Sequence, residues 1–157
     1  MRIDKTCELP FPLELAWTRL TNPELVGACV PGVEKVERVD DTHFAVTVTV
    51  KLGVVRPTFR LNISLAEQIA PRYLRSHCAG EANGMLGSLR QSTEVHLAPL
   101  GESATRLDVS AEFDVFGRLG TFGYGMLKGK ADQLWEQFVR NFSAAEEDTR
   151  CTPTTPR

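Results

Sequence analysis

Three histidines, His43, His77 and His96, are the residues of this chain best suited to acid–base or metal chemistry. His43 and His96 lie in stretches where apolar and polar residues alternate, and both fall on the polar face. His77 is followed directly by Cys78, but adjacent residues of a strand point to opposite faces, so the two cannot form a catalytic thiol–imidazole pair. We therefore expect solvent-exposed histidines and a buried structural thiol.

The four cysteines do not form a metal or redox motif. Cys7, Cys29, Cys78 and Cys151 contain no C-x-x-C pair and no spacing typical of metal ligands. The chain also has no G-x-S-x-G, H-E-x-x-H, Walker A or dinucleotide-binding motif. The sequence therefore predicts no catalytic residue, no bound metal and no cofactor. Because the first residues contain no apolar signal segment, we expect reduced thiols and a cytoplasmic protein.

Polar residues on the expected strands fall into two groups. Asp108 and Glu112 share the outward face of the last strand and predict a solvated sheet surface. Ser76, Gln91 and Thr93 lie instead on faces that otherwise carry Leu, Val and Cys. Buried polar groups need partners, so these three either hydrogen-bond to one another in the core or line a wet or ligand-filled cavity. The sequence leaves both interpretations open.

Length and composition indicate one globular domain with its own core. The chain has 157 residues, of which 42% are hydrophobic and 24% are charged. Its net charge of -2 comes without a cluster of Lys and Arg, so nucleic acid is not an expected partner. No apolar run approaches the ~20 residues that span a bilayer.

Alternation of apolar and polar residues predicts a series of strands joined by short turns. We expect strands at residues 2–9, 33–39, 43–52, 54–65, 72–80, 89–97 and 105–115. Two short helices are expected after the first strand, at 13–20 and 23–28. Asn22 and Pro23 supply the N-cap and the first residue of the second helix. Strands joined by hairpins pair antiparallel and bury one face.

The stretch 117–142 predicts a long amphipathic helix whose first half is unusual. Leu127, Ala131, Leu134, Phe138 and Phe142 recur every three or four residues and form one apolar stripe. Glycines also occupy positions 117, 120, 123, 125 and 129. Each would cost about 0.5–1 kcal/mol inside a helix. Either this half is a loop, or small residues are needed because another element approaches the backbone closely.

Such a helix, placed after half-buried strands, packs its stripe on the apolar face of a twisted sheet. The expected fold class is therefore α+β with a helix-grip architecture. In this fold a curved antiparallel sheet of about seven strands wraps around the C-terminal helix, and two short helices follow the first strand. We expect a single helix-grip domain over residues 1–145 and a polar, disordered tail over 146–157.

One segment resembles a known protein family. Residues 22–39, NPELVGACVPGVEKVERV, combine a short helix beginning N-P-E, the motif Cys-Val-Pro-Gly at 29–32 and a strand rich in Glu and Val. This pattern is similar to the CoxG family of carbon monoxide dehydrogenase subunits, within the START-like, polyketide cyclase-related (SRPBCC) superfamily. The resemblance covers roughly residues 1–145 and implies the same helix-grip fold. Pro57, Gln91 and the short polar tail depart from the family pattern.

The resemblance implies an accessory protein that binds its ligand without catalysis, and not a redox subunit. Members of the family are linked to molybdenum-containing CO dehydrogenases and related hydroxylases, in maturation, membrane association or handling of an electron acceptor. The superfamily binds apolar molecules between sheet and helix, so the implied ligand is a lipid or an isoprenoid quinone. The implied partners are a molybdenum hydroxylase of the CO dehydrogenase type and a peripheral contact with the inner face of the membrane.

We accordingly expect a ligand cavity between the curved sheet and the last helix. Its entrance is predicted at the glycine-rich half of the helix and the loop 30–32, so Gly123→Leu or Gly129→Leu should reduce ligand uptake more than stability. Gln91 and Thr93 would contact a polar head group. The residues expected to line the cavity are Trp17, Val48, Val50, Phe59, Leu61, Leu74, Gln91, Thr93, Phe113, Phe122, Gly123, Met126 and Leu127.

Two other functions stay open on the sequence. A cyclase- or aromatase-like enzyme would use the same cavity but needs an acid or a base that projects into it. The candidates are Tyr124, His77, Arg75 and Glu81. A pure protein–protein assembly factor would instead have a filled core and exposed apolar surface around Val26, Val30 and Val54.

Overall fold

The alternating pattern produces one antiparallel sheet of seven strands, in the order β1-β7-β6-β5-β4-β3-β2. The computed structural model describes residues 1–144. The strands are β1 (Arg2–Leu9), β2 (Val33–Arg38), β3 (His43–Thr49), β4 (Thr58–Ile69), β5 (Tyr73–Ala82), β6 (Gly87–Pro99) and β7 (Thr105–Phe116). The helices are α1 (Leu13–Leu20), α2 (Pro23–Cys29) and α3 (Gly123–Ala144), with the 3₁₀ turns η1 (Asn83–Met85) and η2 (Gly117–Phe122). None of the described helices combines the length and apolar character that a membrane span requires.

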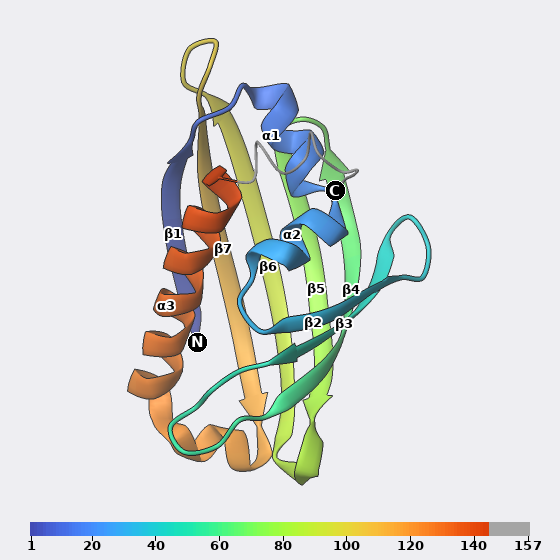
Figure 1. Cartoon of the computed structure of the whole chain (residues 1–157), viewed down its shortest axis with the longest axis vertical. Helices are drawn as coiled ribbons and strands as arrows, with labels where there is room; N and C mark the ends of the chain where they lie inside the picture. The colour runs from blue at the N-terminus through green and yellow to red at the C-terminus, as the bar shows by residue number, and fades with distance from the viewer. Residues whose placement is uncertain (145–157) are drawn as a thin grey trace.

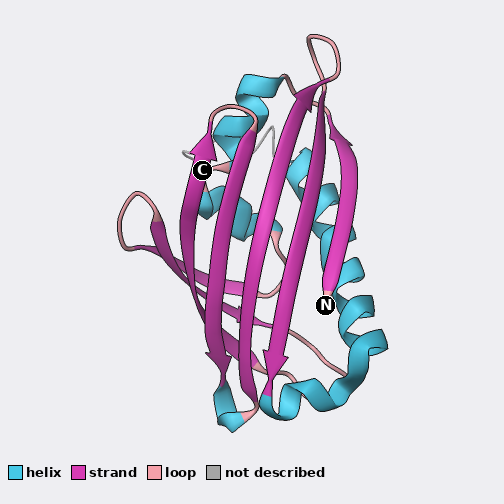
Figure 2. Ribbon diagram, turned by 180° about the vertical axis from the view of Figure 1, so that it is seen from behind, coloured by secondary structure: helices cyan, strands magenta, loops and turns pink. Residues whose placement is uncertain are grey.

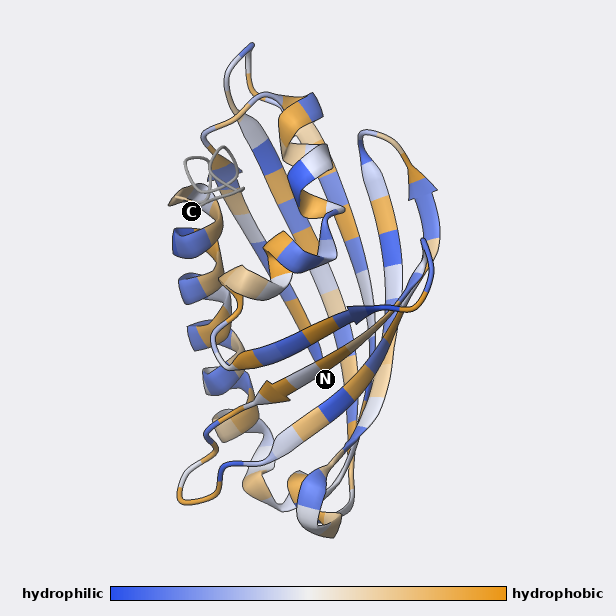
Figure 3. Cartoon of the chain, turned by 45° about the vertical axis from the view of Figure 1, so that its right-hand side comes forward, coloured by the Kyte–Doolittle hydropathy of each residue, from blue (hydrophilic) through white to orange (hydrophobic). Residues whose placement is uncertain are grey.

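All three α-helices lie on one face of the sheet. Figure 1 shows α1 and α2 in front of the central strands and α3 beside β1 and β7, and Figure 2 shows the opposite face uncovered. Hydrophobic and hydrophilic residues alternate along the strands (Figure 3). The sheet therefore buries one face against the helices and exposes the other to solvent. This arrangement confirms the expected α+β helix-grip class. The expected tail at 146–157 lies outside the described residues.

The connection between β3 and β4 differs from the prediction. β3 ends at Thr49 and β4 begins at Thr58, so the strand start expected at residue 54 is wrong. The carbonyl of Pro57 accepts a hydrogen bond from the backbone N of Val50 at 3.0 Å. Pro57 has no N–H to continue the ladder, and the segment between these residues is a hairpin loop.

The capping signals of α2 act as the sequence predicts. Asn22 Oδ1 accepts hydrogen bonds from the backbone N of Glu24 (3.1 Å) and of Leu25 (3.2 Å). Pro23 lies in the first turn, where its missing N–H costs nothing. α2 consequently starts at the expected residue and turns back over the sheet.

The C-terminal end of α3 is fixed in the hydrophobic core. Phe142 is 0% exposed, and its ring meets Phe11 edge-on with centroids 5.8 Å apart and stacks on Phe138 at 5.2 Å. Asn141 Nδ2 donates a hydrogen bond of 3.0 Å to the backbone carbonyl of Cys29. These contacts hold the last turns of α3 against α2 and the segment after β1.

An ion pair ties the middle of α3 to the sheet. Lys5 Nζ, on the inner face of β1, lies 2.6 Å from Asp132 Oδ1. Lys128 Nζ, one helical turn before Asp132, lies 2.9 Å from the other carboxylate oxygen. The hydrogen bonds from Lys5 and then from Lys128 lower the pKa of Asp132 below its ordinary value. α3 is therefore attached to β1 electrostatically as well as by packing.

The glycine-rich stretch is part turn and part helix: residues 117–122 form the turn η2, and α3 begins at Gly123. Gly117 belongs to η2, and a Cβ there would lie 2.9 Å from the backbone at the start of β6, so close approach explains this glycine. Gly123 begins α3 with a φ of +84°, which favours glycine. A Cβ on Gly123, Gly125 or Gly129 would meet nothing within 4 Å. The expected need for small volume between sheet and helix is therefore wrong within α3, and so is the steric reason for gating by Gly123 and Gly129.

Replacing Phe142 by Ala should lower the free energy of unfolding by about 3–5 kcal/mol, because it leaves a cavity between α3 and the core. Urea denaturation followed by circular dichroism measures this change. Tyr124→Ala is the matched control on the same helix. Tyr124 is 58% exposed, so its replacement should change stability by about 0.5 kcal/mol or less. Equal losses in the two variants would contradict the anchoring of α3 through its C-terminal end.

The pair of Lys5 and Asp132 should make stability depend on pH in acid. Because the folded-state pKa of Asp132 is depressed, its stabilising contribution is present above the ordinary aspartate pKa of about 3.9. That contribution is lost as the pH falls through the lower folded value. Asp132→Asn should therefore flatten the decline of unfolding free energy below about pH 4, measured by urea denaturation. The exposed Asp41→Asn is the control, and identical pH profiles for wild type and Asp132→Asn would contradict the role of the pair.

Candidate ligand cavity

A cavity of about 280 Å³ separates the sheet from the N-terminal half of α3. Strands β3, β4, β6 and β7 supply one wall and α3 supplies the other. Apart from Gln91 and Lys130, the side chains on these walls are apolar. The lining residues are Met1, Val30, Val48, Val50, Leu52, Phe59, Leu61, Leu89, Gln91, Phe113, Val115, Leu119, Leu127, Lys130, Ala131 and Leu134. We call this the first cavity.

A second cavity, of about 380 Å³, lies beneath α2 and the end of α1. Strands β2 to β6 form its floor. The lining residues are Leu20, Thr21, Pro23, Val26, Gly27, Val30, Val33, Val36, Phe44, Val46, Val48, Leu61, Ile63, Leu65, Leu74, Ser76, Cys78, Gln91, Thr93 and Val95. No charged side chain is among them, in contrast to the first cavity with Lys130.

The two cavities adjoin along the concave face of the sheet. Val30, Val48, Leu61 and Gln91 line both of them. Val30 comes from the loop after α2, and the other three come from β3, β4 and β6. These residues therefore form the boundary across which one elongated molecule could extend.

Polar side chains gather at this boundary, on the side of the second cavity. Gln91 Nε2 donates a hydrogen bond of 2.8 Å to Thr93 Oγ1 on the same face of β6. Cys78 is opposite Gln91 in the sheet register, and Ser76 is opposite Thr93. Side chains directly opposite each other in an antiparallel pair are neighbours about 5 Å apart. Both sequence interpretations therefore apply, because Gln91 bonds to Thr93 and all three residues also line a cavity.

Cys78 is the ionisable side chain on the wall of the second cavity. Burial raises its pKa to about 11, so the thiol is neutral at physiological pH. Lys130, in the first cavity, directs its Nζ to Gln133 Oε1 at 3.0 Å. Neither group is arranged with a partner that would make it a nucleophile or a general base.

The acid–base candidates named from the sequence lie outside both cavities. His77 and Glu81 are exposed, and β5 runs through Glu81, so the turn expected to begin there starts two residues later. Arg75 makes an ion pair with Glu67 at 3.5 Å. Tyr124 is 58% exposed at the start of α3. The structure thus brings none of these four candidates to a cavity wall.

Most of the expected lining residues do lie on the cavity walls. They are Val48, Val50, Phe59, Leu61, Leu74, Gln91, Thr93, Phe113 and Leu127. The strand periodicity places them, since each points to the concave face of the sheet or belongs to the apolar stripe of α3. That they contact a ligand stays a prediction.

The structure places Trp17, Phe122, Gly123 and Met126 outside both cavities. Trp17 packs against the core around Phe142, and Phe122 packs against the cluster around Leu119. Gly123 has no side chain and borders open space. Met126 is 43% exposed and lines a separate surface hollow. These residues are apolar and near the cavities in sequence, but their neighbours either fill the space around them or leave them at the surface.

Several wall residues were not predicted, although the sequence carries a signal for them. Ala131 and Leu134 belong to the predicted stripe of α3, one and two turns after Leu127. Val30 belongs to the Cys-Val-Pro-Gly motif and reaches both cavities. Lys130 is next to the stripe but outside it, so helical periodicity does not place it on the cavity wall.

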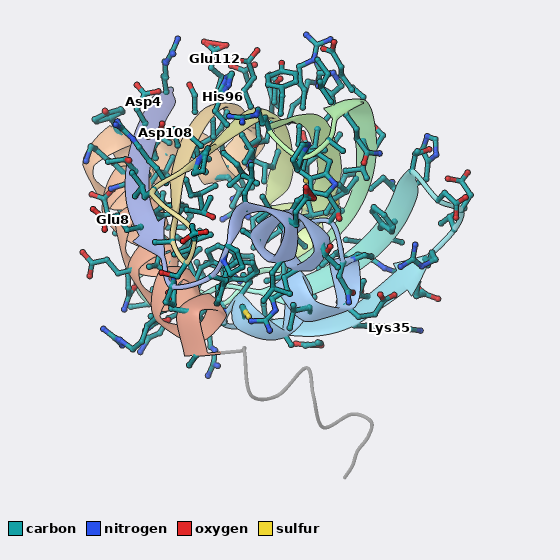
Figure 4. All side chains as sticks on the ribbon, turned by 90° about the horizontal axis from the view of Figure 1, so that it is seen from above. Asp4, Glu8, Lys35, His96, Asp108 and Glu112 are labelled. Carbon is teal, nitrogen blue, oxygen red and sulfur yellow. The ribbon has the colours of Figure 1, made fainter. Side chains whose placement is uncertain are left out.

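Charged side chains occupy the outer face of the sheet instead. Asp4, His96, Asp108 and Glu112 point away from the helices (Figure 4). The pKa of Asp108 is lowered, first by a hydrogen bond from Thr6. Asp4 and Asp108 also pair with neighbouring arginines, at 3.3 and 3.2 Å. This face is the solvated surface expected from the sequence. Within residues 1–144, His, Cys, Asp and Glu nowhere form a group that could hold a metal ion.

A curved antiparallel sheet, a long C-terminal helix and an apolar cavity between them define the START-like class of proteins. A START superfamily protein from Mycobacterium smegmatis is similar with a TM-score of 0.68 and 14% identity, over 94% of this chain and 98% of that chain. A conserved protein from Geobacillus kaustophilus gives a TM-score of 0.85 at 19% identity, over 92% and 93% of the two chains. The ZhuI aromatase/cyclase from Streptomyces sp. R1128 gives 0.71 at 18% identity, over 94% and 93%. At these identities the likeness concerns the fold.

Sequence comparison places the chain within this class. Residues 8–145 match the model of the CoxG family of carbon monoxide dehydrogenase subunits, and the chain belongs to that family. The match covers nearly the whole described structure, including every cavity-lining residue except Met1. The resemblance identified from residues 22–39 is therefore confirmed. No curated protein matches the chain.

Cys78 should react slowly with alkylating reagents while the protein is folded. Its pKa is about 11, compared with about 8.5 for an ordinary cysteine, so much less reactive thiolate is present at pH 8. Iodoacetamide labelling at pH 8, followed by peptide mass spectrometry, should be roughly 100-fold slower for Cys78 in the native protein than in urea. The native rate should rise about tenfold per pH unit between pH 7 and 9. Equal rates in the folded and unfolded protein would contradict burial of this thiol.

Proposed function

We propose that the protein binds one elongated apolar molecule, a lipid or an isoprenoid quinone, across the two adjoining cavities without catalysing a reaction on it. Membership of the CoxG family and the START-like fold support a hydrophobic-ligand-binding accessory role. The observation that carries the proposal is the pair of apolar-walled cavities that meet at Gln91.

The apolar part of the ligand belongs in the first cavity. Each CH₂ group moved there from water gains ~0.8 kcal/mol, so a segment of about six carbons contributes roughly 5 kcal/mol before entropic costs are subtracted. A ligand would also restore the dispersion contacts that wall side chains such as Phe59, Phe113 and Leu127 lack across an open space. Affinity therefore comes mainly from this part of the molecule.

The polar end of the ligand belongs beside Gln91, Thr93 and Ser76. Gln91 donates one amide hydrogen to Thr93, and its carboxamide offers a second hydrogen and an oxygen to a ligand. The head group is uncharged, because the walls of the second cavity offer no charged side chain and a buried charge without a partner is costly. A quinone carbonyl or a lipid hydroxyl or ester meets this requirement.

We place this binding module beside a molybdenum-containing enzyme of the CO dehydrogenase type, in maturation, membrane association or delivery of an electron acceptor. The support is the name of the family, which describes its members as carbon monoxide dehydrogenase subunits. In this role the protein works in the cytoplasm, at the inner face of the membrane where lipids and quinones are available.

A cyclase- or aromatase-like enzyme is the alternative function, because one solved structure with this fold is described as an aromatase/cyclase. The positions of Tyr124, His77, Arg75 and Glu81 outside the cavity walls favour binding over acid–base catalysis. A pure assembly factor would need a filled core, whereas Val26 and Val30 line an open cavity. Binding is thus the function that the cavity geometry supports best.

Native mass spectrometry and organic extraction of the purified protein test the proposal, with a one-to-one complex with an apolar molecule as the expected result. Ala131→Phe projects a ring from α3 into the first cavity and should reduce the bound fraction roughly tenfold. Glu136→Phe, on the exposed side of the same helix, should bind like wild type. A protein that carries no apolar molecule and takes up neither added quinone nor added lipid would overturn the proposal.

A further inference from the structure

α2 and β2 lie side by side (Figure 1 and Figure 3), and together they form one wall of the second cavity. Pro23, Val26 and Gly27 line the cavity from α2. Val33 and Val36 line it from β2. A gap between these two elements would therefore open the second cavity directly to solvent, without passage through the first cavity.

This wall is tightly closed in its middle and at the C-terminal end of α2. A Cβ on Gly27 would collide with the side chain of Val36, so helix and strand are in direct contact there. Pro31 and Gly32 connect α2 to β2 without a break in the chain. A Cβ on Gly32 would collide with the backbone carbonyl of Thr49, so this turn also packs closely on the sheet.

The other end of the wall, at the start of α2, is closed by an ion pair. Arg38 is the last residue of β2, and its Nη2 lies 3.2 Å from Glu24 Oε1. Glu24 directly follows Pro23, which lines the cavity from α2. The Arg38 guanidinium also lies over the ring of Phe44, 5.6 Å from its centroid, and Phe44 lines the cavity from β3. The pair thus joins the two sides of the wall at this end.

The pair lies on the solvent side of the wall. The side chains of Arg38 and Glu24 are 46% and 56% exposed, and neither lines the cavity. An exposed ion pair is screened by water and stabilises a contact only weakly, so it breaks and re-forms readily. Arg38 is followed by residues 39–41, which are exposed as well, so few contacts oppose the movement of this strand end away from α2.

We propose that Glu24 and Arg38 form the latch of a side entrance to the second cavity, through which a ligand enters and leaves. While the pair is formed, the arginine covers Phe44 and closes the gap between the start of α2 and the end of β2. When the pair breaks, Phe44 and the groups deeper in the cavity become accessible from solvent. The passage of a ligand rests on the proposed function, whereas the latch itself does not.

Two cysteines report on the latch without any ligand. Cys78 is on the wall of the second cavity, so iodoacetamide must enter that cavity to reach its thiol. Cys7 lines neither the first nor the second cavity, and burial raises its pKa to about 11, the same value as that of Cys78. Alkylation of Cys78 therefore measures the opening of the cavity, and alkylation of Cys7 in the same sample measures unfolding of the whole domain.

Glu24→Arg should raise the alkylation rate of Cys78 in the native protein about tenfold, because repulsion between two guanidinium groups replaces the ion pair. Arg38→Glu should have the same effect through two carboxylates. The two substitutions combined in one chain restore an ion pair with exchanged charges and should return the rate to that of wild type. The rate for Cys7 should stay constant in all three variants, as measured by peptide mass spectrometry.

Lys35 and Glu37 supply the matched control, because they form an exposed ion pair of 3.6 Å on the same strand. Lys35→Glu and Glu37→Lys should leave the rate for Cys78 unchanged. Ala131→Phe, which narrows the first cavity, should leave it unchanged too. The latch would be overturned by equal rates in wild type and Glu24→Arg, by a combined variant that stays fast, or by a rate that falls in Ala131→Phe.

The uncharged apolar dye N-phenyl-1-naphthylamine tests the passage of a ligand. In stopped-flow fluorescence, Glu24→Arg should raise the association and dissociation rates by the same factor and leave Kd unchanged, because Glu24 does not line the cavity. A changed Kd with unchanged rates would contradict a role as an entrance. If the dye binds to no variant while Cys78 labelling still depends on Glu24, the proposed function and the ligand passage fail and the latch stands.

Discussion

The structure depends on how the apolar, concave face of its sheet is covered. α3 is fixed at its C-terminal end by Phe142, which is completely buried against Phe11, and at its middle by the pair of Lys5 and Asp132. Towards Gly123 the helix runs beside β1 and β7 (Figure 1), and its side chains do not fill the concave face. Close packing normally removes such voids. Here the anchors join α3 to Phe11 and to the edge strand β1, and neither draws the helix onto the strands that form the cavity wall.

The sheet also separates charged side chains, which lie on its outer face, from the apolar and neutral polar side chains on its inner face. Carboxylates and arginines pair on the outer face of the sheet, where water screens them. The inner face holds neutral polar groups, Gln91, Thr93 and Ser76, next to a thiol that burial keeps protonated. An interior of this kind favours an apolar molecule with an uncharged polar end, which is the ligand that we propose.

Much of this protein is determined by its sequence alone. Period-two alternation predicts the strands, and Asn22 with Pro23 predicts the start of α2, because strand faces and helix caps depend on residues that are neighbours in the chain. The stripe of α3 and the motif around Val30 are also local, and together they predict the helix-grip fold and the family. The residues that face inward from β3, β4 and β6 follow from the same alternation.

Only the tertiary structure decided which inward-facing residues border empty space. Leu127 and Phe142 belong to one stripe, yet Leu127 lines a cavity and Phe142 is packed on every side. Trp17 and Phe122 are apolar and were expected in the cavity, but they pack against the hydrophobic clusters beside it. Periodicity gives the direction of a side chain, whereas a cavity depends on the distance to the element opposite. That distance is set by contacts between Phe11 and Phe142 and between Lys5 and Asp132, which join residues far apart in the chain.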